Sequence, residues 1–107
     1  MLIKISEDFS KTPGARYGSE GPYSGEKFRD ELLIPKYIEA KGIGETLEID
    51  LDGCYGFATS FLEESFGGLV RSLKEKNVLN TIKIISNDDA TLENLIIKYV
   101  KEAEEKL

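Results

Sequence analysis

Two adjacent hydroxyl side chains, Thr59 and Ser60, lie in the run DLDGCYGFATSFLEESFGG, residues 50–68, where an apolar segment turns through glycines into a helix-like segment. A helix N-terminus presents unpaired backbone amides and a partial positive charge, and both stabilise an anionic group placed there. A phosphate on either hydroxyl would be favoured at this position and would change how the surface meets a partner. Thr59 and Ser60 are therefore candidate phosphoacceptors.

The same run also has a purely structural interpretation. Residues 60–63, Ser-Phe-Leu-Glu, fit the capping box, in which Ser60 accepts from an early helix amide and Glu63 reaches back to the cap. Gly67 and Gly68 would then lie inside the helix, each at a cost of roughly 1 kcal/mol relative to alanine. Close packing against a neighbouring element, or a local break in the helix, should accompany them.

Two aspartates at positions i and i+2, Asp50 and Asp52, offer a different chemistry. The string IDLDG resembles the first motif of haloacid-dehalogenase-like phosphatases, in which one aspartate attacks phosphorus and the other acts as acid and base with magnesium. Residues 87–89, Asn-Asp-Asp, could imitate the acidic metal-binding motif of those enzymes. Cys54 stands where their threonine normally does. A magnesium-dependent phosphatase is thus the alternative function.

Other site chemistry is restricted by composition. The chain has one cysteine, Cys54, and no histidine, which excludes an intramolecular disulfide and leaves no ligand set typical of zinc. The lack of an activating histidine disfavours a cysteine hydrolase and favours a buried structural role for Cys54. Arg16, in the glycine-rich stretch 12–25, could bind an anion or form an ordinary surface ion pair. That stretch lacks the Lys-Ser/Thr ending of a phosphate-binding P-loop. We expect no cofactor and no metal.

Length and charge limit the remaining classes. The 107 residues predict a single domain, residues 1–107, and the formal charge of −6 disfavours nucleic acid and anionic lipid as partners. No signal-peptide h-region is present, and no apolar run approaches the ~20 residues that span a bilayer. The sequence predicts a soluble cytoplasmic protein with no membrane association.

Periodicity predicts the elements that would position these residues. Strands are expected at residues 2–6, 15–19, 46–53 and 81–86, the second of them in a hairpin after Pro13-Gly14. Helices are expected from Ser24 to Gly44, with an interruption at Pro35, over residues 60–76, and from Asp88 or Asp89 to Ala103. Because residues 82–85 carry apolar groups on both faces, their strand should be interior. The result is an α/β domain with a mixed four-stranded sheet and about three helices.

Two blocks carry a family resemblance, TPGARYGSEGPYSGEKFRDELL and DLDGCYGFATSFLEESFGGLVR. They look like the uncharacterised STAS-like family, and the order of elements resembles the STAS fold of anti-sigma factor antagonists. In those regulators the matching turn carries an aspartate followed by a serine or threonine, which an ATP-dependent partner kinase phosphorylates. Ala58 stands here at the position of the aspartate, and Thr59 at that of the acceptor.

The resemblance implies a non-enzymatic regulatory or protein-interaction module. The resemblance implies a protein partner of the ATP-dependent, histidine-kinase-like ATPase type. We expect the partner surface around residues 56–66, and its candidate residues are Phe57, Phe61, Glu63 and Glu64. Phe57 and Phe61 could instead belong to the core.

Overall fold

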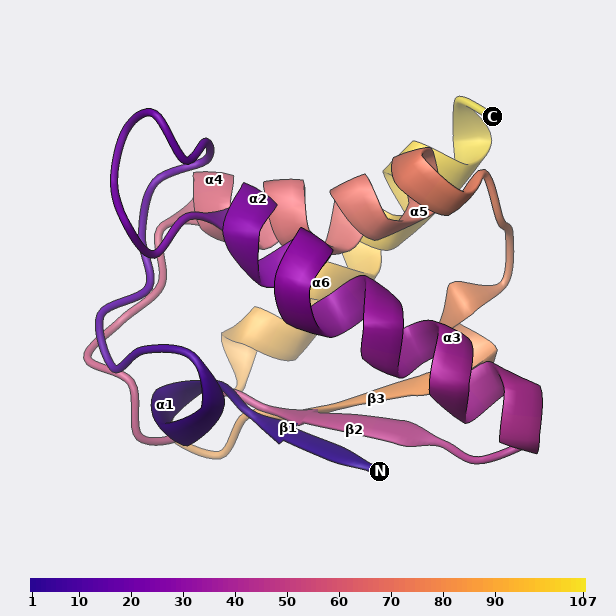
Figure 1. The fold of residues 1–107 in the computed structure, drawn as a ribbon, viewed down its shortest axis with the longest axis horizontal. Helices are drawn as coiled ribbons and strands as arrows, with labels where there is room; N and C mark the ends of the chain where they lie inside the picture. Colours follow the sequence, from indigo (N-terminus) through magenta and orange to yellow (C-terminus); the bar gives the residue numbers. More distant parts are fainter.

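Three short strands form one sheet, in the order β1-β2-β3, and all run parallel (Figure 1). They are β1 Leu2–Lys4, β2 Leu47–Asp50 and β3 Ile82–Ile85 in a computed structural model that describes residues 1–107. The register aligns Ile3 with Ile49 and Ile49 with Ile84, so the alternating apolar side chains of neighbouring strands meet on one face. The predicted mixed four-stranded sheet is wrong in strand number and in direction.

Helices connect and follow the strands. The sequence turns helical directly after β1, in α1 Ile5–Asp8. One unbroken helical run is made of α2 Gly25–Phe28, the π turn η1 Arg29–Leu33 and α3 Ile34–Ile43. A second run is made of α4 Thr59–Leu62, the π turn η2 Glu63–Gly67 and α5 Gly68–Leu73. The 3-10 turn η3 Val78–Asn80 precedes β3, and α6 Thr91–Glu105 closes the chain. The helix missed by the prediction is α1, which replaces the end of the expected strand 2–6.

The expected strand 15–19 is absent because its backbone bonds to a helix instead. The carbonyls of Ala15 and Arg16 accept hydrogen bonds from the first amides of the α2 run, those of Gly25 and Glu26, at 3.0 Å each. Ala15 also has a left-handed backbone, with φ of 69°, which a strand does not tolerate. Residues 15–19 therefore form a loop that closes onto the start of α2.

Helices cover only one face of the sheet. Since crossovers between parallel strands are right-handed in nearly all proteins, a strand order that never reverses places every crossover helix on the same side. Figure 1 shows this arrangement: the run from α2 to α3, the run from α4 to α5, and α6 all lie above the sheet. The covered face holds Ile3, Ile49 and Ile84, all within a single cluster of buried apolar residues.

The opposite face carries charged side chains and no covering helix. Leu2, Glu48 and Lys83 form one row across it, and Lys4, Asp50 and Ile85 form the next. Leu2 is 54% exposed and Lys83 is also exposed. The predicted interior position of the third strand is wrong: β3 is an edge strand, and its extra apolar residue Ile85 is half-buried on the open face.

Several helix boundaries agree with the sequence signals. The Ser24 hydroxyl accepts from the amide of Lys27 at 3.1 Å and caps α2, as predicted. The α-helical geometry restarts at Ile34, with Pro35 in the first turn of α3, and Gly44 ends that helix with φ of 71°. No helix is both long enough and apolar enough to cross a membrane.

Candidate functional site

Two loops meet at the carboxyl end of the sheet. Residues 9–24 follow α1, residues 51–58 follow β2, and both lie at the same end of the molecule in Figure 1. The amide of Tyr55 donates to the carbonyl of Lys11 at 2.8 Å, and the Cys54 thiol lies 3.5 Å from the carbonyl of Ser10. These contacts join the two glycine-rich segments of the sequence into one surface.

Asp52 holds the ends of β2 and β3 together. Its carboxylate accepts from the backbone amides of Asn87 and Asp88, at 2.7 and 2.8 Å, and from the side-chain amide of Asn87 at 3.0 Å. The hydrogen bond from the Asp88 amide is the largest of the effects that lower the pKa of Asp52. Asp52 is therefore ionised, and its carboxylate already accepts three hydrogen bonds within the protein.

Asp50 is likewise engaged by its neighbours. It accepts from the amide of Asp52 at 2.9 Å and from the Lys4 ammonium at 3.3 Å. No group of three or more Cys, Asp or Glu side chains is arranged to hold a metal ion. The phosphatase motif thus corresponds to a strand-end turn, in which Asp50 and Asp52 bond to the backbone and to Lys4.

A hollow of about 240 Å³ opens beside these turns. Its lining comes from residues 51–57, from the segment after β3 and from α6: Leu51, Cys54, Tyr55, Gly56, Phe57, Ser86, Asp88, Asp89 and Leu92. Burial is the main cause that raises the pKa of the Cys54 thiol, so Cys54 stays protonated and is a poor nucleophile. An apolar wall beside two carboxylates suits binding rather than covalent chemistry.

Thr59 and Ser60 begin the second helical run, but neither caps it. The N-cap is Ala58, which offers no side-chain acceptor, and Thr59 is the first helical residue. Thr59 is exposed, Ser60 is half-buried, and neither hydroxyl forms a hydrogen bond with the protein. The predicted capping box is wrong because the helix begins before Ser60 and because Glu63 bonds elsewhere.

Glu63 and Glu64 belong to a network of ion pairs with three arginines. Arg16 binds both carboxylates, Arg29 binds Glu64 and Arg71 binds Glu63 at 2.7 Å. Burial opposes ionisation of Glu63, but hydrogen bonds from Arg71 and Arg16 outweigh it and lower the pKa of Glu63. Arg16 therefore fastens the loop after α1 to the π turn η2 and is not free to bind an anion. Because Glu64 is only 8% exposed, these glutamates offer a partner little surface.

The side chains of this network also pack closely against the two glycines inside the helix, Gly67 and Gly68. A Cβ at Gly67 would lie 2.5 Å from a carboxylate oxygen of Glu63 and 3.1 Å from a guanidinium nitrogen of Arg71. A Cβ at Gly68 would lie 2.8 Å from a guanidinium nitrogen of Arg29. The helix is also a π turn over Glu63–Gly67. Close packing or a local irregularity was expected here, and both are present.

The exposed aromatic residues at this end are tyrosines, not the expected phenylalanines. Phe61 is fully buried and Phe57 is half-buried against the core, so Phe61 offers no contact area to a partner. Of five tyrosines in the chain, the three on these loops are each at least 41% exposed: Tyr17 at 48%, Tyr23 at 41% and Tyr55 at 83%. Our sequence reasoning missed them. The available signal was a tyrosine flanked by Gly or Pro, since these neighbours favour turns over helices and strands.

Comparison with known proteins identifies a family but no function. The model of a STAS-like domain of unknown function (DUF4325) matches residues 24–92, from the Ser24 cap of α2 to the start of α6. No curated protein and no solved structure matches the chain. The match covers more than half of the chain, including β2, β3 and the turn with Thr59. The chain therefore belongs to this STAS-like domain family.

Proposed function

We propose that this chain is a non-enzymatic protein-interaction module, and that phosphorylation of Thr59 regulates its binding. The observation that carries the proposal is Thr59 itself, an exposed hydroxyl without a protein partner at the first residue of a helical run. Its surroundings are the loop 51–58 and the loop 9–24 with which that loop is hydrogen-bonded. Together these two loops form the proposed partner surface.

The exposed tyrosines favour a protein as the partner. Tyrosine is enriched at the buried centres of protein interfaces, because it supplies a large contact area and a polar hydroxyl at little conformational cost. Tyr17, Tyr23 and Tyr55 lie on the two loops of this surface. A bound protein would cover rings that are now in water.

A phosphate on Thr59 would be stabilised where it formed. The amides of Phe61 and Leu62 already donate to the Ala58 carbonyl, whereas those of Thr59 and Ser60 have no acceptor in the protein. A phosphate would supply acceptor oxygens that Ala58 lacks, at the positive end of the helix. It would also add about two negative charges to the partner surface, so a partner that binds the unmodified surface would be released. Membership of the STAS-like family supports an ATP-dependent kinase as the source of this phosphate.

Phosphopeptide mapping tests the switch directly. The protein is isolated from the cells that naturally produce it and digested with trypsin, which releases residues 42–71 as one peptide. We expect phosphate on Thr59 when fragment ions separate it from the other hydroxyls of that peptide, Thr46, Tyr55, Ser60 and Ser65. Thr46 is the internal control, because it is also exposed but lies at the opposite end of β2. Phosphate on Thr46 alone, or on none of these residues, would refute the switch.

Photo-crosslinking tests the partner surface. A photoreactive phenylalanine analogue replaces Tyr55 in one variant and Ile43 in a control variant, where the side chain is 61% exposed at the end of α3. We expect the Tyr55 variant to form a discrete protein adduct that Thr59→Glu weakens. Equal adducts from both positions, or an adduct indifferent to Thr59→Glu, would remove the loops as the partner surface.

A further inference from the structure

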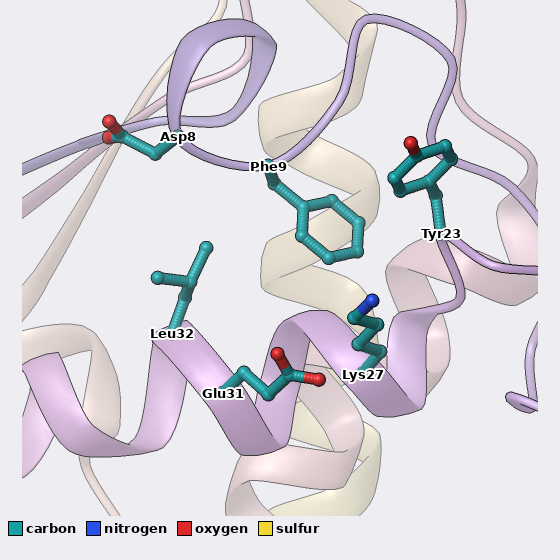
Figure 2. Close-up of a pocket in the computed structure, with 6 residues that line it drawn as sticks. All are labelled: Asp8, Phe9, Tyr23, Lys27, Glu31 and Leu32. Atoms are coloured by element: carbon teal, nitrogen blue, oxygen red, sulfur yellow. The ribbon is translucent and has the colours of Figure 1, made fainter.

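A second hollow, of about 290 Å³, lies between α1 and the helical run that begins with α2 (Figure 2). Six residues line it: Asp8, Phe9, Tyr23, Lys27, Glu31 and Leu32. Figure 2 shows Lys27 pointing from the helix toward the ring of Phe9, which descends from the segment after α1. The Glu31 side chain extends along the helix, beside Lys27. The hollow thus combines opposite charges with an apolar surface.

The π turn keeps the two helical charges apart. Lys27 and Glu31 are four residues apart, a spacing that brings side chains together on a regular α-helix. Here Glu31 lies in the π turn η1, whose wider turn displaces it from that position. Neither side chain forms an ion pair. The ammonium of Lys27 lies 6.0 Å from the centre of the Tyr23 ring instead. Both charges therefore remain available at the hollow, and π turns of this kind are frequent at functional sites.

The apolar part of the hollow is held in place by ring contacts. Phe9 packs edge-on against Tyr23 and against Phe28, with ring centres 5.7 and 5.4 Å apart. Phe28 is fully buried, whereas Phe9 and Leu32 are half-buried and keep part of their surface open. Their exposed surface would contact an apolar group placed between the two charges.

We propose that this hollow binds a free α-amino acid with an apolar side chain. The ligand carboxylate would pair with Lys27, its ammonium with Glu31, and its side chain would pack on Phe9 and Leu32. Asp8 lines the hollow from α1, where it is exposed and one of its oxygens accepts from the amide of Lys4. The volume lies just below the roughly 300–1,000 Å³ of sites for larger molecules, which suits a ligand of amino-acid size.

Titration of the isotope-labelled protein with L-phenylalanine tests the site by NMR. We expect saturable shifts of the backbone amides of Phe9, Lys27 and Glu31. Two analogues each lack one charge: N-acetyl-L-phenylalanine has no ammonium and phenethylamine has no carboxylate. Each should bind at least about tenfold more weakly, because a charge-assisted hydrogen bond is lost. No saturable shift up to the solubility limit, shifts confined to other amides, or an analogue that binds as tightly as L-phenylalanine would overturn the proposal.

Substitutions assign the charges to residues. Lys27→Met keeps most of the stem and removes the ammonium, and Glu31→Gln removes the carboxylate charge. Each should weaken L-phenylalanine binding at least about tenfold. The control is Lys98→Met, which removes the same charge from the exposed face of α6 and should leave binding unchanged. Unaltered binding by Lys27→Met would refute the assignment, and the analogue series in the unmodified protein decides the question if a variant fails to fold.

Discussion

Serines 24 and 60 look alike in the sequence but have different roles. Ser24 is fully buried and caps α2 through the amide of Lys27, whereas Ser60 follows an uncapped helix start at Ala58. We predict that Ser24→Ala lowers the free energy of unfolding by about 1 kcal/mol, the usual effect of a lost cap. Ser60→Ala should change it by less than about 0.5 kcal/mol, since its hydroxyl has no protein partner. Urea unfolding of the two variants measures both values.

A substitution at Ala58 should raise the stability of the same helix start. Its backbone is extended, as a capping residue requires, but its methyl group accepts no hydrogen bond. Ala58→Asp should therefore raise the free energy of unfolding by about 0.5–1 kcal/mol, through a new cap and a favourable charge at the helix start. If Ser60→Ala proves as costly as Ser24→Ala and Ala58→Asp has no effect, the helix start differs from the one described here.

Two helices cross where Gly25 leaves space for a backbone. A Cβ at Gly25 would lie 2.6 Å from the carbonyl oxygen of Phe61 in α4, and a backbone atom cannot swing aside as a side chain can. We predict that Gly25→Ala separates α2 from α4 and lowers the free energy of unfolding by about 1–3 kcal/mol, the usual cost of overpacking. Chemical unfolding with a probe of secondary structure measures this loss.

Gly42 provides the control for this crossing. It also lies in a helix, near the end of α3, but a Cβ there would meet nothing within 4 Å. Gly42→Ala should raise the free energy of unfolding by about 0.5–1 kcal/mol, because alanine restricts the unfolded chain more than glycine does. Equal effects of the two substitutions would contradict the close approach at Gly25.

Local patterns predicted some elements well. Alternation identified β2, the 3.6-residue stripe identified α6, and Ser24 and Gly44 marked the ends of the first long helix. Each of these signals is contained within a few residues of the element that it predicts. The family blocks likewise pointed to the STAS-like family, which the matched residues 24–92 confirm.

The predictions that failed concern residues whose contacts are distant in the sequence. Arg16 pairs with Glu63, 47 positions further along the chain, and so keeps it out of a capping box. The carbonyls of residues 15 and 16 accept hydrogen bonds from α2 rather than from a neighbouring strand. Burial of Phe61 and exposure of Tyr55 follow from which loop packs on which helix. Local sequence patterns do not reveal such long-range packing, so the exposed tyrosines were missed, and Thr59 stays a candidate acceptor.

Helices cover only one of the two faces of the parallel sheet in this fold. Parallel sheets are usually covered on both faces, but the unreversed strand order leaves one face here to charged residues. It also removes the crevice that forms where strand order reverses, the common binding position in open α/β sheets. Both hollows are accordingly built from loops and helix starts, beside the sheet rather than within it.

The stability of the entire fold should depend on the ionisation of one buried tyrosine. Tyr37 of α3 is 1% exposed, and its hydroxyl donates to Glu75 at 3.0 Å, which ties α3 to the segment after α5. Burial, followed by the Glu75 carboxylate, raises the pKa of Tyr37 to about 12. Because the folded pKa exceeds the unfolded value of 10.0, this stabilisation is complete below pH 10.0 and is lost as pH rises toward about 12.

Tyr37→Phe isolates this effect. At neutral pH the variant should have a lower free energy of unfolding than the unmodified protein, measured in urea. The expected difference is the net value of one hydrogen bond to a charged group, about 1.5–3 kcal/mol. Above about pH 10 this difference in the free energy of unfolding should shrink, because the tyrosine ionises first in the unfolded chain and stabilises that state. The lysines titrate equally in both proteins and do not contribute to the difference. Tyr55→Phe, at a ring that is 83% exposed, should follow the unmodified protein throughout. A difference between Tyr37→Phe and the unmodified protein that stays constant up to about pH 11 would show that the Tyr37 hydroxyl does not keep its proton in the folded state as described.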